Sequence, residues 1–333
     1  MATAVVYSIG KGGVGKTTCA AALALHASRS FQTLVVSLDP AHNLGDVLAT
    51  RLKEKPREVT AHLWASEINM EAAINRYLKD SAEKLRQMYS YLKVINMEGY
   101  LDAIKMSPGI EEYATLQAIE EILSGVDGRY DLIVMDTPPT GLTLRVLALP
   151  QVSLMWGERI GRLRKEILSK RQMMTNIHGE RRLVLDGREH EMPSDPKTDP
   201  VMNELNHYVS RMKGLSSLQS DASRSRVMPV MNADRLSLFE TRRALESLEK
   251  LKMSVGPIIV NKVGMKTTDG RTVEEIASEL RRELKTLPFM DQEPVGLPAI
   301  EEVSRHIDFT CWYPQTLHAA GGTHSLAQGK ERN

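Results

Sequence analysis

The sequence predicts an α/β fold in which a mostly parallel sheet carries helices on both faces. Short apolar runs alternate along the chain with longer helical patterns, as in strand-helix-strand units. The runs that we interpret as strands are 5–9, 33–38, 132–136, 227–232 and 257–261. Polar residues stand at or directly after the ends of these runs, and folds of this class bind ligands outside the carboxyl ends of their strands.

The first predicted strand leads into a glycine-rich loop, and an alanine-rich helical stretch follows from Cys19. This loop, GKGGVGKTT from Gly10 to Thr18, contains the pattern G-x-x-x-x-G-K-[ST]. In that setting the backbone N–H groups surround a β-phosphate, Lys16 reaches the β- and γ-phosphate oxygens, and the Thr17 hydroxyl binds Mg²⁺. The sequence therefore predicts a P-loop NTPase. Its candidate nucleotide-binding residues are Gly12, Gly13, Val14, Gly15, Lys16, Thr17 and Thr18.

Length and composition are those of a globular enzyme. The chain has 333 residues, of which 42% are hydrophobic, so it can bury a substantial core. Its 43 Lys and Arg nearly cancel its 42 Asp and Glu, which gives no global electrostatic reason to expect nucleic acid or an anionic membrane surface as a partner. The sequence shows no apolar stretch of membrane-spanning length and no room for a signal peptide before the first strand. We expect a cytoplasmic protein that reaches a membrane only through a partner.

Cysteine usage excludes a disulfide framework. The chain has two cysteines, Cys19 and Cys311, far apart and without partners at the spacing of a zinc site. We therefore expect no zinc, and we interpret both side chains as packing residues.

Three features stand in order along the chain: the early lysine of the loop, Lys11, the segment LDPAHNLGD at 38–46, and the segment DTPPTGLTLR at 136–145. Together they resemble the ArsA-type ATPases. Lys11 is similar to the signature lysine of deviant Walker-A ATPases, and the two segments resemble switch I and switch II of the ArsA family. That family includes arsenite-pump ATPases and guided-entry ATPases, which deliver tail-anchored membrane proteins.

The resemblance implies a role for each of these residues. Asp39 would orient or deprotonate the water that attacks ATP, and Asp136 would hold Mg²⁺ through water. Lys11 would reach the nucleotide of a second subunit across a face-to-face dimer. A homodimer is the expectation, with a heterodimer with a paralogue left open.

Weaker similarities extend the resemblance over about residues 2 to 305. They lie at 63–69, 107–112, 236–243, 260–262 and 293–297. In the family, an asparagine at the position of Asn261 reads the adenine edge, and the loop that contains Pro294 closes over the base.

One ATPase domain is expected over 1–318, with helical insertions at about 70–125 and 151–225 and a flexible tail at 319–333. Apolar residues recur every three or four positions in the second insertion, which indicates helices with one apolar face. The candidate client-binding residues there are Trp156, Ile160, Leu163, Met173 and Met212. Residues 181–192 resemble a hairpin that turns at Asp186 and Gly187, and a link at 193–200 follows. The role of both is left open.

The sequence therefore predicts a dimeric ATPase with ATP and Mg²⁺ as cofactors, which captures a hydrophobic client such as a tail-anchored segment. A first alternative is an arsenite-pump ATPase that docks on a membrane permease. The thiol cluster that a soft metalloid prefers is missing within one chain. A second alternative is a partitioning or positioning ATPase, and a third is a largely non-hydrolytic partner in a heterodimer. The identity of the client and of any membrane receptor does not follow from the sequence.

Overall fold

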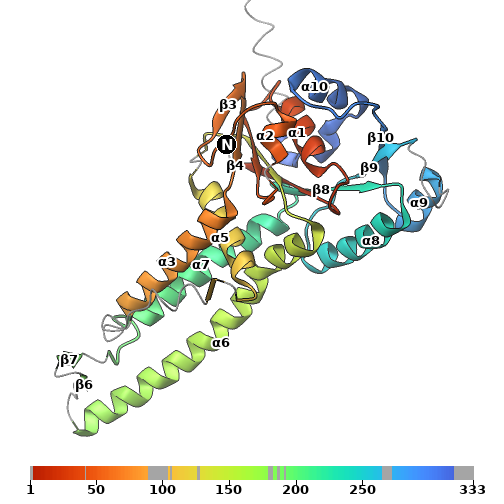
Figure 1. Ribbon diagram of the computed structural model, residues 1–333. Coiled ribbons are helices and arrows are strands. Elements are labelled where there is room, and N and C mark those ends of the chain that lie inside the picture. Colours follow the sequence, from red (N-terminus) through yellow and green to blue (C-terminus); the bar gives the residue numbers. More distant parts are fainter. Residues whose placement is uncertain are drawn as a thin grey trace, which may run out of the picture. The chain divides into compact units, whose positions relative to one another are not determined.

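The computed structural model describes residues 3–41, 43–88, 104–105, 107–125, 128–178, 183–185, 188–190, 193–264 and 272–318. The chain divides into two compact units (Figure 1). Unit 1 comprises Met1–Met70, Ala118–Leu147 and Leu218–Asn333, and unit 2 comprises Glu71–Gln117 and Ala148–Ser217. Unit 2 thus comes from two separate segments of the chain. One ATPase domain with helical insertions at about 70–125 and 151–225 stays a prediction. The tail at 319–333 lies outside the described residues.

Unit 1 is built on an eight-stranded sheet with the order β10-β9-β8-β1-β5-β2-β4-β3. Its strands are β1 (Ala4–Ile9), β2 (Thr33–Ser37), β3 (Arg57–Thr60), β4 (Leu63–Glu67), β5 (Leu132–Asp136), β8 (Ser225–Asn232), β9 (Ile258–Val263) and β10 (Leu284–Pro288). All neighbours pair in parallel except β3 and β4, which are antiparallel. The mostly parallel sheet that the sequence predicts is confirmed, and the five predicted runs all form strands.

Helices cover both faces of this sheet (Figure 1). Those of unit 1 are α1 (Lys16–Ala27), α2 (Asn43–Val47), α8 (Arg235–Lys250), α9 (Val273–Leu280) and α10 (Leu297–His306), followed by the 3₁₀ turn η2 (Phe309–Trp312). Neighbouring residues of β9 show the two faces, because side chains alternate along a strand. Ile259 packs in the apolar cluster that includes α1 and α10, whereas Ile258 and Val260 pack in the cluster that includes α8 and α9.

Unit 2 is mostly helical. It is formed by residues from α3 (Met70–Met88), α5 (Ile110–Gly125), α6 (Thr140–His178) and α7 (Pro200–Ser220). Each of these helices has residues in both units. Asp199 caps α7 by accepting from the Met202 N–H at 2.8 Å, and it also accepts two hydrogen bonds from Arg164 of α6, at 2.6 and 3.1 Å. Among the described residues, no helix is long and apolar enough to cross a membrane.

The hairpin predicted at 181–192 has two strands, β6 (Leu183–Leu185) and β7 (Arg188–His190), which pair antiparallel. The expected turn residues, Asp186 and Gly187, lie outside the described residues.

Candidate functional site

The glycine-rich loop joins the end of β1 to the start of α1, and its glycines are required by its geometry. Gly13 and Gly15 have φ angles of 80° and 92°, in the left-handed region that disfavours side chains. A Cβ on Gly10 would lie 2.2 Å from the Val230 carbonyl oxygen of the neighbouring strand β8. The loop therefore follows a path that other residues could not take at these positions, and α1 begins directly after it at Lys16.

Lys16 is the first residue of α1, and its side chain reaches back to the loop. Its side chain is buried, and its ammonium group donates to the backbone carbonyl of Lys11 at 3.4 Å. Thr17 and Thr18 are half-buried in the first turn of α1, while Gly12 and Gly13 are exposed. The loop thus places a cation and a helix N-terminus together, which is the arrangement that binds phosphate in P-loop proteins.

Asp136 ends strand β5 and is fully buried. One carboxylate oxygen accepts from the Ser37 hydroxyl at 3.2 Å, and the other has no hydrogen-bond partner. Burial raises the pKa of Asp136 from 3.8 to about 6, although the Thr17 hydroxyl and the Lys16 ammonium lower it in part. A buried carboxylate oxygen without a partner beside a threonine hydroxyl fits the second shell of a Mg²⁺ ion, as sequence analysis expected for Thr17 and Asp136.

Asp39 follows strand β2 by two residues and lies close enough to Asp136 to raise the pKa of that carboxyl. One Asp39 carboxylate oxygen accepts from the Ala41 N–H at 3.0 Å, which forms a local turn, and the side chain remains partly exposed. Asp39 and Asp136 thus lie close together at one site. His42 of the same motif lies outside the described residues.

A row of polar side chains crosses the carboxyl edge of the sheet. Glu67, Ser37, Asp136 and Ser8 stand in register on β4, β2, β5 and β1. The Ser37 hydroxyl donates to Asp136 and accepts from the Asp39 N–H at 3.3 Å, so it connects the two aspartates. Sequence analysis missed Ser37 and Glu67 as site residues, and the signal that could have found them is a polar residue at the end of a strand.

The segment after Asp136 is held against the glycine-rich loop. The Thr137 hydroxyl donates to the Ser8 carbonyl at 2.7 Å, and the Thr140 N–H donates to the Gly10 carbonyl at 3.3 Å. The first turn of α6 therefore starts at the phosphate loop, as expected of a switch II segment that responds to the γ-phosphate.

Asn261 lies at the glycine-rich loop from the side of β9. Its amide donates to the Val14 carbonyl at 2.9 Å, and the adjacent Lys262 ammonium donates to the Gly13 carbonyl at 3.1 Å. The structure thus places Asn261 beside the loop, and its contact with the adenine edge stays a prediction. The structure also adds Lys262, which the sequence did not single out. The loop with Pro294 is tied to α2, because the Gly296 N–H donates to the Val47 carbonyl at 2.8 Å.

Four of the five candidate client residues lie on the surface of α6. Trp156, Ile160, Leu163 and Met173 are between 46% and 61% exposed. Val152, Met155, Ile167, Met174 and Ile177 extend this exposed apolar surface along the same helix. Met212 of α7 is fully buried and does not belong to it. The apolar face of an amphipathic helix is covered by a partner. The sequence pattern does not distinguish a client from the rest of the protein as that partner.

Comparison with known proteins decides the family. Residues 3–308 match the ArsA ATPases, described as anion-transporting ATPases. This chain belongs to the ArsA ATPase family. A relative named as an arsenical pump-driving ATPase from Prosthecochloris vibrioformis is 31% identical over 90% of this chain and 73% of its own length. ATPase GET3C of Arabidopsis thaliana is 32% identical over 76% of this chain and 65% of its own length, and ATPase ASNA1 homolog 1 of Paramecium tetraurelia is 28% identical over 78% and 74%.

This ArsA-type chain is therefore an ATPase, and its family implies that it uses ATP. Mg²⁺, when bound, neutralises negative charge on the phosphates. Thr17 and, through water, Asp136 are the residues that would hold it.

Lys16→Ala is expected to weaken ATP binding itself. Removing one partner of a desolvated charge pair costs about 2–5 kcal/mol, so the dissociation constant should rise about 100-fold. Titration with a fluorescent ATP analogue measures this, and Lys250→Ala, an exposed lysine of α8, is the control. An unchanged dissociation constant would contradict the role of Lys16.

Asp136→Asn is expected to stabilise the Mg²⁺-free protein at high pH. Between its unfolded pKa of 3.8 and its folded pKa of about 6, Asp136 keeps a proton when folded and releases it when unfolded. The folded wild type therefore loses stability as pH rises through this window, by about 3 kcal/mol for this carboxyl.

Thermal unfolding with a chelator at about pH 4 and about pH 8 tests this. The gain in Tm of Asp136→Asn over the wild type should be larger at the higher pH. Equal differences at both pH values would show that burial does not penalise this carboxylate.

Proposed function

We propose that this ATPase works as a dimer that captures a hydrophobic protein segment, such as the membrane segment of a tail-anchored protein, and releases it in step with ATP hydrolysis. The observation that carries this proposal is the apolar stripe of α6, which we define as Trp156, Ile160, Leu163, Ile167 and Met174. These side chains are spaced by three, four or seven residues, which places them on one face of the helix, and all are exposed in unit 2. Contiguous exposed apolar surface of this kind is typical of binding sites for apolar partners.

The stripe lies beside a packed face of the same helix. Leu168 is fully buried, Gly157 is buried, and a Cβ on Gly157 would meet the Val209 side chain of α7 at 2.4 Å. This face of α6 already packs on α7 within unit 2. The exposed stripe is thus available in addition to the residues that hold the unit together.

ATP hydrolysis follows from the residues around the loop. The loop and Lys16 bind the phosphates, and Asp39 positions or deprotonates the attacking water. Ser37 holds the Asp39 backbone and the Asp136 carboxylate in one arrangement. Phosphoryl transfer needs mainly such positioning and charge neutralisation.

A dimer is proposed because of Lys11. Its backbone carbonyl accepts from Lys16 of the same chain, and its side chain is half-exposed near the start of the loop. By resemblance to the family, this side chain reaches the nucleotide of the partner subunit. The mass of the purified protein with and without ATP tests this. A mass that requires a different second chain would instead support the heterodimer.

A second candidate function is favoured by the relatives named as arsenical pump-driving ATPases. Arsenite binds thiolates. Burial raises the pKa of the Cys19 thiol to about 12 and that of Cys311 to about 11, which disfavours the thiolate of both. We therefore rank arsenite-driven pumping second. Membership of the ArsA family supports both of these functions over partitioning.

The deciding experiment measures ATPase activity and oligomeric mass with and without arsenite, and with and without a hydrophobic helical peptide, alongside capture of that peptide. Capture by a dimer with arsenite inert supports client targeting. Stimulation by arsenite without capture supports the pump.

The double variant Trp156→Ser and Leu163→Ser is expected to lose peptide capture by about 30-fold or more, since central apolar anchors each contribute at least about 1 kcal/mol. A matched control is Leu236→Ser, which removes an exposed leucine of α8 in unit 1. Pull-down at several peptide concentrations measures the difference. Undiminished capture by the double variant would place the client elsewhere.

A further inference from the structure

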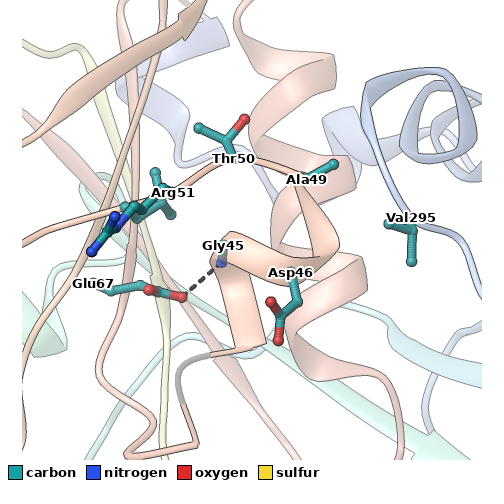
Figure 2. A pocket seen from close by; sticks show the side chains of 8 residues that line it. Gly45, Asp46, Ala49, Thr50, Arg51, Glu67 and Val295 are labelled. Carbon is teal, nitrogen blue, oxygen red and sulfur yellow. Dashed lines mark hydrogen bonds between the residues drawn. The ribbon is translucent and has the colours of Figure 1, made fainter.

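Glu67 ends strand β4 and contacts the helix that follows Asp39. Its carboxylate accepts a hydrogen bond of 2.7 Å from the backbone N–H of Gly45 in α2, and Figure 2 shows the side chain directed at that amide. The bond is short because its acceptor is charged. Glu67 is partly buried and stands in register with Ser37 of β2.

Two backbone N–H groups of the switch I segment, residues 38–46, thus donate to side chains of the neighbouring strands β2 and β4. Ser37 accepts from the N–H of Asp39 at 3.3 Å at one end, and Glu67 accepts from the N–H of Gly45 at the other. Both anchors belong to the polar row that also contains Asp136.

The surroundings of Gly45 make this contact specific. A Cβ on Gly45 would lie 2.9 Å from the Thr50 carbonyl oxygen and 3.4 and 3.5 Å from the two Glu67 carboxylate oxygens. A pocket of about 560 Å³ adjoins the contact, and Glu67, Gly45 and Asp46 contribute to its lining (Figure 2). The buried Leu44 side chain packs α2 against the core. The hydrogen bond to Glu67 holds α2 on the side that faces the pocket.

We infer that Glu67 is a positioning residue for ATP hydrolysis, which holds switch I so that Asp39 stands at its place beside the γ-phosphate. The inference rests on the proposed role of Asp39. Glu67 acts through the backbone of Gly45. A misplacement of about 1 Å at a reacting group costs about 100-fold in rate, so loss of this anchor affects the chemical step more than binding.

Three variants of Glu67 test the contact. Glu67→Ala removes the acceptor, and Glu67→Asp shortens the side chain so that it no longer reaches Gly45. Glu67→Gln keeps an amide oxygen that can accept the same hydrogen bond. We expect kcat to fall about 10- to 100-fold for Ala and Asp and to stay within about threefold for Gln, with the dissociation constant of ATP changed less than about threefold in all three.

Gly45→Ala perturbs the same contact from the other side. Its new methyl group meets the Glu67 carboxylate and the Thr50 carbonyl, so kcat should fall as in Glu67→Ala. The double variant Glu67→Ala with Gly45→Ala should have a kcat no lower than that of the slower of its two single variants, because both changes remove the same interaction. Glu58→Ala, which removes an exposed carboxylate on the adjacent strand β3, is the matched control and should keep the wild-type kcat.

Two further variants separate this inference from the role of Asp39. They are the single variant Asp39→Asn and the double variant that combines Glu67→Ala with Asp39→Asn. If Glu67 acts through Asp39, the double variant is no slower than Asp39→Asn. Slow Asp39→Asn with wild-type kcat in Glu67→Ala overturns the inference and leaves the proposed function. Wild-type kcat in Asp39→Asn overturns the role of Asp39 and with it the inference. A fall in Tm that accompanies the loss of kcat in Ala and Gln alike would show a merely structural role.

Discussion

Replacing Lys11 with alanine is expected to abolish ATP hydrolysis with a much smaller loss of nucleotide binding. In the proposed dimer this lysine contributes its charge to the partner's nucleotide when negative charge develops on the phosphates. Cationic side chains supplied in this way accelerate phosphoryl transfer by about 10³- to 10⁵-fold, so turnover should fall by at least about 10³. Binding depends mainly on the loop and on Lys16, which the substitution leaves in place.

Mixing two inactive variants distinguishes a contribution across the interface from one within a chain. A Lys11→Ala subunit retains Asp39, and an Asp39→Asn subunit retains Lys11, so each mixed dimer has one complete site. Random pairing makes half of the dimers mixed, which should restore about one quarter of the wild-type turnover. Lys250→Ala controls for loss of a surface charge. A fully active, monomeric Lys11→Ala protein would contradict the cross-interface role.

Asp39→Asn is expected to bind ATP and hydrolyse it about 10²- to 10⁴-fold more slowly, the usual contribution of a positioned general base. The asparagine side chain can still accept the hydrogen bond from the Ala41 N–H, so the local turn remains. The variant loses only the negative charge that attracts the proton of the attacking water. We therefore expect ATP to persist in the site and the dimer to stay closed.

Single-turnover hydrolysis and size-exclusion chromatography with ATP measure these two consequences. Asp80→Asn makes the same chemical change at an exposed position of α3 in unit 2 and serves as the control. Unaltered steady-state turnover in Asp39→Asn would remove Asp39 from the reaction and direct attention to other groups near the γ-phosphate.

The sequence predicted the central strands of the sheet well and its edges poorly. Strands buried on both faces are continuous apolar runs, such as β5, which the sequence bounds as 132–136 and the structure as Leu132–Asp136. The edge strands β3 and β10 were not predicted. β3 has four residues, REVT, of which two are exposed, and β10 mixes Lys285 and Pro288 with its apolar residues. Edge strands have one neighbour and carry charged residues and proline, so the apolar signal is weak.

The residues of the candidate site also fall into two groups, those that are neighbours in the sequence and those that are far apart in it. The loop residues and Asp39 stand in short motifs whose chemistry is local. Ser37 and Asp136 are 99 residues apart, and Lys262 and Gly13 are 249 apart, so their contacts depend on strand order and register. Met212 shows the same limit for helices. The sequence pattern marks it as apolar but does not tell a buried position from an exposed one, and Met212 is fully buried.

The strand order also has a consequence for how this chain is synthesised. β1 is synthesised before the other strands of the sheet, yet it lies in the middle of the sheet, and one of its two neighbours, β8, pairs Ser225 with Val5. An apolar strand with an unpaired edge is a template for aggregation, and β1 keeps such an edge until both segments of unit 2 have been translated. The glycine-rich loop gains its last contacts later still, because Asn261 and Lys262 of β9 donate hydrogen bonds to its carbonyl groups. The nucleotide site is therefore complete only late in translation. Until β8 has been made, the unpaired edge of β1 is exposed to aggregation.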